Sequence, residues 1–214
     1  MANTADLKPF RSYDEHDVVN LFALDDPSVN LNVDDVKIKK GVLVAVEGDG
    51  WKNTDEALDS HGLGGASSTS APGKSFANTV SLRYGTTARV QPAASGDTAA
   101  PLGLTLWDMA ERDENGEKLL YHPRKAAEMQ AVISGQTMPV LTKGVVLYKG
   151  QLTAAAGGQA AAIVPGTAIY ASQSGAGELS TTSTSVGGAV APAKVATALG
   201  KVDSDEYVLL KVEL

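Results

Sequence analysis

Two short motifs in this chain resemble parts of ligand-binding loops, and the first is a phosphate-loop fragment. Gly73-Lys74-Ser75 matches the last three positions of the loop whose backbone N–H groups and lysine hold nucleotide phosphates. The full motif requires a glycine where this chain has Ser68, a hydrophobic strand before it and a helix after it. Pro72 and the neighbouring serines and threonines favour neither element. The sequence therefore predicts no nucleotide site.

The second motif resembles the start of a calcium-binding loop. Glu111, Asp113 and Asn115 place acidic or amide side chains at alternate positions before Gly116. The twelfth position is His122, however, where a calcium loop has the bidentate glutamate that completes the coordination shell. The pattern favours a hairpin turn, because Asn-Gly between two apolar runs is a strong hairpin signal. A weak, adventitious cation site is the alternative.

No other residues form a recognisable catalytic set. His16, His61 and His122 are far apart and lie in no zinc-binding pattern, and no serine lies in a Gly-x-Ser-x-Gly motif. No carboxylate pair stands out from the acidic background, and the chain contains no cysteine. The sequence therefore predicts no catalytic residues, no metal site, no cofactor and no enzymatic activity.

Composition narrows the classes of partner. With 25 acidic and 18 basic residues the net charge is −7, which disfavours nucleic acid because phosphate contacts need clustered lysine and arginine. No apolar run is long enough to span a membrane, and no secretory signal is evident, so we expect synthesis in the cytoplasm of the producing cell and no membrane partner. Only 5% of residues are aromatic, so the core must consist of small and β-branched side chains.

The elements that must position these residues are mainly short strands. Val208, Leu210 and Val212 alternate with mixed residues, as expected of a strand with one apolar face. One helix is expected at 123–134, beginning at Pro123 and lying across a sheet between two modules. Further strands are expected at 17–24, 36–46, 79–84, 87–91, 103–110, 117–121, 139–148, 167–171 and 194–202.

Several glycine motifs occur twice and in the same order. Lys40-Gly41-Val42-Leu43-Val44 is echoed by Lys143-Gly144-Val145-Val146-Leu147, and Pro101-Leu102-Gly103 is echoed by Ala198-Leu199-Gly200. A third pair couples Gly85-Thr86 and Ser95-Gly96 with Gly166-Thr167 and Ser174-Gly175. A tandem duplication and chance recurrence of short motifs are both open explanations.

The expected architecture is mainly β, with β-sandwich or β-barrel modules that a tandem duplication could have produced. We expect an extended N-terminal arm at 1–17, a first β module at 18–122 with a long loop at 52–79, a connecting helix at 123–135 and a second β module at 136–214. The arm carries isolated apolar residues among charges and cannot form a core alone.

The pattern of the second half resembles the head decoration, or capsid cement, proteins of tailed bacteriophages. The resemblance rests on Thr142–Tyr148, Gly166–Ala171, Ser174–Leu179, Ala198–Val202 and Tyr207–Leu214. It covers 17–51 more loosely, and the loop at 52–79 and the helix depart from it.

This resemblance implies a homotrimer on the outer surface of the virion capsid. Such a protein binds the expanded icosahedral head and stabilises contacts between subunits of its partner, the major capsid protein. Leu7, Phe10 and Tyr13 would form the capsid-binding arm, because an extended segment can add to a partner's sheet edge.

Two alternatives remain. The first is another virion component, such as a head fibre base, a tail tube or a minor spike protein. The second is a carbohydrate-binding β-sandwich, which the shortage of aromatic residues disfavours. Trp107 lies in an apolar run and is expected in the core, whereas Trp51 could be exposed or could cover a core edge.

Overall fold

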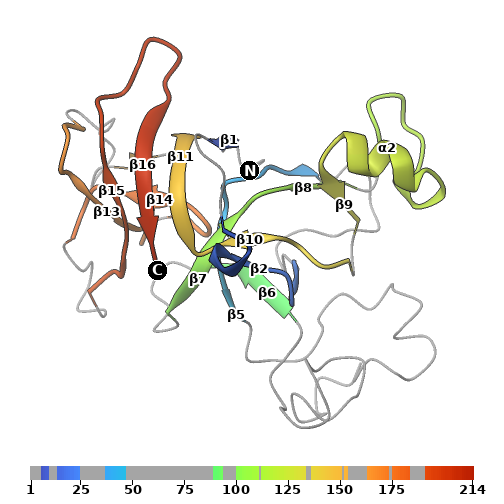
Figure 1. Ribbon diagram of the computed structural model, residues 1–214, viewed down its shortest axis with the longest axis horizontal. Coiled ribbons are helices and arrows are strands. Elements are labelled where there is room, and N and C mark those ends of the chain that lie inside the picture. The colour runs from blue at the N-terminus through green and yellow to red at the C-terminus, as the bar shows by residue number, and fades with distance from the viewer. Residues whose placement is uncertain are drawn as a thin grey trace, which may run out of the picture.

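The prediction of a mainly β fold is confirmed by the computed structural model (Figure 1). The predictions for Phe10, Tyr13, Trp51 and loop 52–79 lie outside the residues that the structure describes. The described residues form three sheets and one α-helix. They are 6–9, 14–24, 37–46, 89–93, 100–110, 112–133, 136–150, 152–153, 163–173, 175–183 and 191–214.

The largest sheet has seven strands in the order β1-β11-β16-β15-β13-β14-β12. Neighbouring strands are antiparallel except for β12 and β14, which are parallel. The first strand of the chain lies at one edge, where it pairs with β11. The strands are β1 (Asp6–Pro9), β11 (Lys143–Lys149), β12 (Leu152–Thr153), β13 (Ala168–Ala171), β14 (Leu179–Ser180), β15 (Lys194–Ala198) and β16 (Val208–Glu213).

The second sheet has six strands in the order β2-β10-β7-β5-β6-β3, and the third has three in the order β4-β8-β9. The second comprises β2 (Val18–Val19), β3 (Ala23–Leu24), β5 (Leu43–Val46), β6 (Arg89–Pro92), β7 (Pro101–Thr105) and β10 (Val140–Leu141). The third comprises β4 (Lys37–Ile38), β8 (Asp108–Ala110) and β9 (Ala131–Val132). The helical elements are η1 (Glu15–Asp17), η3 (Leu119–Tyr121) and α2 (Pro123–Glu128).

The six-stranded sheet is buried on both faces. Leu43 and Ala45 of β5 belong to the core that the seven-stranded sheet completes, whereas Val44 belongs to a second core with β8 and β9. Leu141 and Val140 of β10 divide between the two cores in the same way. Because successive side chains of a strand point to opposite faces, these nearly continuous apolar runs supply two cores at once.

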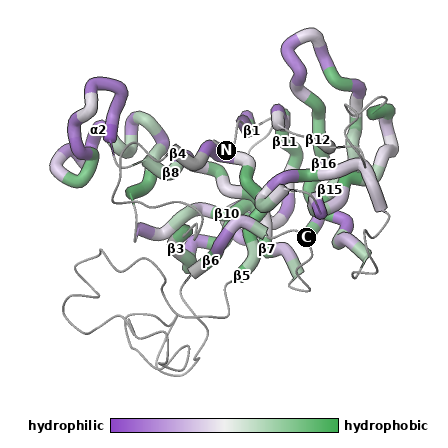
Figure 2. Tube along the Cα trace, turned by 180° about the vertical axis from the view of Figure 1, so that it is seen from behind, coloured by the Kyte–Doolittle hydropathy of each residue, from purple (hydrophilic) through white to green (hydrophobic). Residues whose placement is uncertain are grey.

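The last strand has the alternation that the sequence predicts. Val208, Leu210 and Val212 are buried, while Lys211 and Glu213 are exposed. Figure 2 shows the same contrast on a larger scale: hydrophobic residues line the central strands, and the hairpin beside α2 is largely hydrophilic.

The helix begins where it was predicted but is much shorter. Pro123 occupies its first turn, and the helix ends at Glu128. Gln130 then takes a left-handed conformation with φ of 51°, and the chain continues as strand β9. The helix contacts η3 and β9 at the far end of the molecule from the seven-stranded sheet (Figure 1), and so does not lie between two modules as expected.

Sheet membership changes within the predicted second β module, 136–214. Strand β10 lies within 136–214 yet joins the six-stranded sheet, and the change of sheet falls at Thr142. The motifs at 40–44 and 143–147 both lead into strands, β5 and β11. The motifs that follow them are placed differently. Pro101-Leu102-Gly103 lies in β7, directly beside β5. Ala198-Leu199-Gly200 begins at the last residue of β15, which β16 separates from β11. Among the described residues, the strand order around the two sets of motifs therefore differs.

Candidate functional site

A hairpin after β8 carries the residues that resembled a calcium loop. Arg112 and Lys118 form a single antiparallel bridge across it, so the predicted turn is present. The strand predicted at 117–121 is wrong, because Leu119–Tyr121 form the 3-10 turn η3. The Gly116 N–H donates to the Asp113 carbonyl at 3.1 Å, and Gly116 has φ of 82°. Asn115 does not share a positive φ, so the turn is not the type I′ that Asn-Gly favours.

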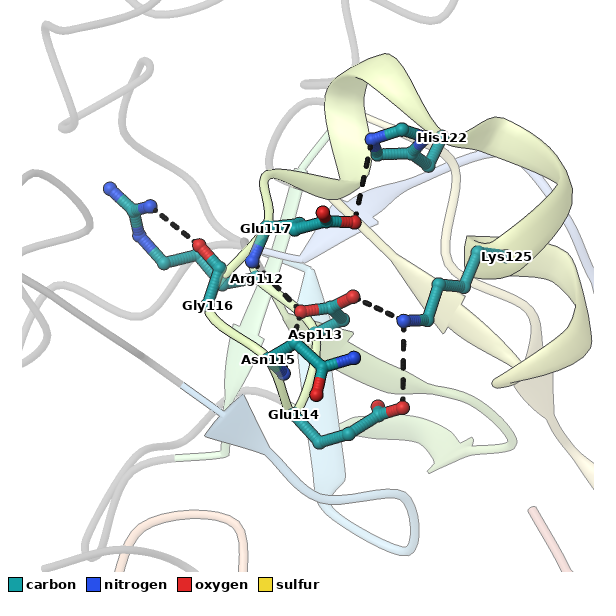
Figure 3. Close-up of polar contacts among 8 residues, drawn as sticks. All are labelled: Arg112, Asp113, Glu114, Asn115, Gly116, Glu117, His122 and Lys125. Carbon is teal, nitrogen blue, oxygen red and sulfur yellow. Dashed lines mark hydrogen bonds and ion pairs between the residues drawn. The ribbon is translucent and has the colours of Figure 1, made fainter.

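The carboxylate of Asp113 explains this geometry (Figure 3). Its Oδ1 accepts hydrogen bonds from the backbone N–H groups of Asn115 and Glu117, both at 2.8 Å. Its Oδ2 accepts a hydrogen bond from the Lys125 ammonium on α2. A side chain that is only 2% exposed thus has partners for both oxygens and joins the hairpin to the helix.

The electrostatics of this pair follow from the contacts. The hydrogen bond from Lys125, together with the two backbone donors, lowers the pKa of Asp113 to about 2, although loss of solvent acts in the opposite direction. The hydrogen bond with Asp113 raises the pKa of Lys125. Both groups are therefore charged at neutral pH and form an ion pair.

The ammonium of Lys125 occupies the position beside the turn where a bound cation would be expected. It lies between Asp113 and Glu114, whose Oε1 is 3.5 Å from Nζ (Figure 3). The carboxylate oxygens that would attract a metal ion already neutralise this internal cation. The arrangement is that of a structural turn. Among the described residues no group of three or more histidine and acidic side chains is placed to hold a metal ion.

The hairpin and helix enclose a small core of their own. Ala110, Leu119, Ala126 and Ala131 are buried in it. We call residues 108–110 and 112–133 the hairpin–helix unit. Since Leu119 faces this core from the η3 turn, the next two residues face away: Leu120 is 59% exposed and Tyr121 is 72% exposed. This pair is the most exposed apolar surface of the unit.

A second turn of the same construction lies between β15 and β16. Asp203 Oδ1 accepts hydrogen bonds from the backbone N–H groups of Asp205 at 2.9 Å and Tyr207 at 2.8 Å. Asp113 likewise accepts hydrogen bonds from the residues two and four positions after it. The residue at the left-handed position is Glu206, with φ of 68°. The two turns are therefore equivalent in backbone and differ in the residue at the left-handed position.

Tyr207 of this second turn fixes β1 to the sheet. Its hydroxyl donates to Asp6 Oδ2 at 2.6 Å, and the Lys8 ammonium lies 4.1 Å from the centre of its ring. The Lys40 ammonium lies 3.7 Å from Asp6 Oδ1. Burial would raise the pKa of Asp6, but the hydrogen bond from Tyr207 and the nearby lysines lower it overall.

Leu7, the one predicted arm residue that the structure describes, lies in this strand. It is 1% exposed and belongs to the core shared by the two larger sheets. Its Cα partner across the ladder is Tyr148, which is also buried. Leu7 therefore stabilises its own chain, and residues 6–9 are an edge strand within the 1–17 segment that was expected to be an arm.

The other predicted residues lie apart from one another. His16 is in η1, and His122 precedes α2, where its Nε2 is 3.7 Å from Glu117 Oε2 and its side chain makes no capping hydrogen bond. Trp107 packs against the second core, as expected. No helix among the described residues is long and apolar enough to cross a membrane.

Comparisons with known proteins do not assign the chain to a family. No family model, no curated protein and no solved structure matches it.

Sequence reasoning missed two parts of this site. The Asp113–Lys125 pair joins residues twelve positions apart, and no local pattern indicates that a lysine on the helix will reach the turn. The exposure of Leu120 and Tyr121 had a signal, because three consecutive large apolar residues on a single turn cannot all face one core.

Proposed function

We propose that this chain is a bacteriophage head decoration protein. It binds the outer surface of the expanded head, stabilises contacts between major capsid subunits and acts without catalysis. The resemblance that suggested this role falls largely on three strands of one sheet, β11, β13 and β16. A mainly β, acidic chain with few aromatic residues is consistent with such a role.

The observation that carries the proposal is the position of β1. It is the last strand of the seven-stranded sheet, so its outer edge pairs with no strand among the described residues. An open edge can accept an extended segment of another protein. Phe10 and Tyr13 follow this edge in the sequence.

The direct test is cosedimentation of the purified protein with undecorated, expanded heads of its phage. Saturable binding at a fixed ratio to the major capsid protein is the expected result. Light scattering of the free protein should give about three times the 22.0 kDa mass of the chain if it forms the proposed trimer. Lack of binding to heads would refute decoration, and a monomer would refute the trimer.

The contribution of the N-terminal segment is best tested by point substitution. Deleting residues 1–16 would also remove Leu7 from the core, so loss of binding could reflect unfolding. The double variant Phe10→Ala, Tyr13→Ala leaves β1 unchanged and should bind heads at least tenfold more weakly. Leu21→Ala, which removes an exposed apolar side chain elsewhere, is the control and should bind normally.

A further inference from the structure

The turn after β8 contains the one Asn-Gly pair of the chain, Asn115-Gly116. Asparagine is a chemically labile residue type, and it deamidates when the backbone nitrogen of the next residue attacks its side-chain carbonyl carbon. Glycine hinders this attack least, because it has no Cβ atom and adopts conformations that other residues avoid. The pair is therefore a candidate site of covalent modification.

The reaction needs no co-reactant other than water. A bond forms between the Gly116 backbone nitrogen and Asn115 Cγ, and the Cγ–Nδ2 bond breaks. The side-chain nitrogen leaves as ammonia with the proton that the Gly116 nitrogen loses, and a cyclic imide remains. Water then opens the imide at either carbonyl carbon. The products are aspartate and isoaspartate, and each places a new carboxylate in the turn.

The surroundings of the pair leave room for this chemistry. Asn115 and Gly116 are both exposed, so water reaches them. The side-chain amide of Asn115 makes no hydrogen bond to the residues that the structure describes. A Cβ atom at Gly116 would meet nothing within 4 Å, so no other group crowds the residue that supplies the attacking nitrogen.

The hydrogen bonds of Asp113 oppose the reaction (Figure 3). The Gly116 N–H, which must lose its proton, donates to the Asp113 carbonyl at 3.1 Å. The N–H groups of Asn115 and Glu117 on either side donate to Asp113 Oδ1. Rotation of the Gly116 peptide group toward Asn115 Cγ would break the first of these bonds, so the reaction requires the turn to open.

We propose that Asn115 is a site of spontaneous deamidation and that Asp113 controls its rate by holding the turn closed. Asp113 is buried, and Lys125 holds its other carboxylate oxygen, so the closed turn is the stable state. Asn115 is preserved while the turn is closed, and it reacts only in the fraction of molecules whose turn has opened.

The modification would weaken the turn that delays it. The new carboxylate joins Glu114 and Glu117, while Lys125 already pairs with Asp113 and Glu114. Isoaspartate also lengthens the backbone by a methylene group, so the Asp113 carboxylate could no longer hold the N–H groups on both sides of Gly116. A deamidated chain therefore has a looser connection between the hairpin and the helix.

The test compares the wild-type protein with Asp113→Ala during incubation in mildly alkaline buffer. Mass spectrometry of the proteolytic peptide that contains Asn115 follows the loss of the amide, and fragmentation identifies isoaspartate. Asp113→Ala should deamidate about tenfold faster than the wild type, because the turn loses two hydrogen bonds to a charged acceptor.

Two control variants accompany this comparison. Asp203→Ala removes the same two hydrogen bonds from the equivalent turn and should deamidate at the wild-type rate. Asn115→Gln should show no modification at this position, which assigns the signal to Asn115. Equal acceleration by Asp113→Ala and Asp203→Ala would overturn the proposal, since the effect would then reflect a general loss of stability.

A second measurement needs no substitution and applies even if Asp113→Ala does not fold. Hydrogen exchange of the Glu117 amide in the wild-type protein gives the fraction of molecules with an open turn. A synthetic peptide of residues 111–118 gives the rate for an unprotected pair. The wild-type protein should deamidate at the peptide rate multiplied by that fraction. A wild-type rate equal to the peptide rate would overturn control by the turn, and an unreactive peptide would overturn the site itself.

Discussion

Asp113 and Asp203 organise their turns with the same hydrogen bonds, yet only the first turn has glycine at its left-handed position. Gly116 has φ of 82° and Glu206 has φ of 68°. A residue with a Cβ atom is strained in this region, whereas glycine is not. The second turn is therefore the less favourable of the two.

Replacing Glu206 by glycine should stabilise the protein. We expect the free energy of unfolding to rise by about 0.5–1 kcal/mol, since relief of strain exceeds the entropy that glycine adds to the unfolded chain. Urea denaturation measures the change. Glu206→Gln is the control, because it removes the ion pair with Lys149 at 3.2 Å without changing the backbone preference. A stabilised glutamine variant and an unchanged glycine variant would contradict the strain argument.

Asp113 gives the protein a stability contribution that depends on pH. The pKa of Asp113 is about 2 in the folded chain and near 3.8 in the unfolded chain, so folding favours the ionised carboxylate. The contribution is complete above the unfolded value and is lost as the pH falls through the folded value. Asp113→Asn should therefore be less stable than the wild type at pH 6, and the difference should shrink between pH 4 and pH 2.

Urea unfolding at a series of pH values checks this expectation. Asp203→Asn is the matched control, because it alters the equivalent turn without touching the Asp113–Lys125 pair. A difference between Asp113→Asn and the wild type that stays constant down to pH 2 would show that the carboxylate's charge is unimportant.

Among the strands, the pairing of β7 with β10 depends on a close approach of two backbones. A Cβ atom at Gly103 would collide with the Leu141 carbonyl and the Val140 side chain. Gly200, its counterpart in the repeated motif, would place a Cβ atom in ordinary contact with Leu209 at 3.9 Å. The same residue type therefore has a steric role at one position only.

Alanine at Gly103 should destabilise the protein by about 2 kcal/mol through overpacking. Alanine at Gly200 should change stability by less than about 0.5 kcal/mol. Thermal and urea unfolding of the two single variants measure both effects. Equal effects at the two positions would mean that the β7–β10 contact tolerates a methyl group.

Sequence patterns correctly predicted those elements that depend on residues close together in the chain. The alternation in 208–213 and the start of the helix at Pro123 are confirmed, because each depends on side chains close in sequence. The predicted end of the helix was wrong, because Gln130 adopts a left-handed conformation that its residue type does not indicate. The turn at Asn115-Gly116 was right, but it is not the type I′ that Asn-Gly favours, because the Asp113 carboxylate accepts hydrogen bonds from the backbone N–H groups of the turn.

At the scale of the whole molecule, the sequence could not give the order of the strands. Leu7 looked like an isolated apolar residue in a polar arm, and its burial depends on pairing with residues 146–149. Such pairing between distant segments leaves no periodic signal. For the same reason, the continuous apolar run of β5 did not reveal that its alternate residues belong to two different cores.

The seven-stranded sheet brings together the beginning and the end of the described chain. Strand β11 pairs with β1 on one side and with β16 on the other. A variant ending at Asp205 loses all of β16 and leaves β11 and β15 without their shared neighbour, so it should fail to fold. Circular dichroism and size-exclusion chromatography would show this, and a folded truncated monomer would contradict it.

This arrangement also has a consequence for biosynthesis. The interior strand β16 is made after every other strand of its sheet, so the sheet cannot be completed until residue 213 has left the ribosome. Until then the apolar faces of β11 and β15 are exposed on the nascent chain. Distant strand pairing is intrinsically slow, and exposed strand edges promote aggregation. Yield in a producing cell should therefore depend on temperature and chaperone supply more than the stability of the finished protein would suggest.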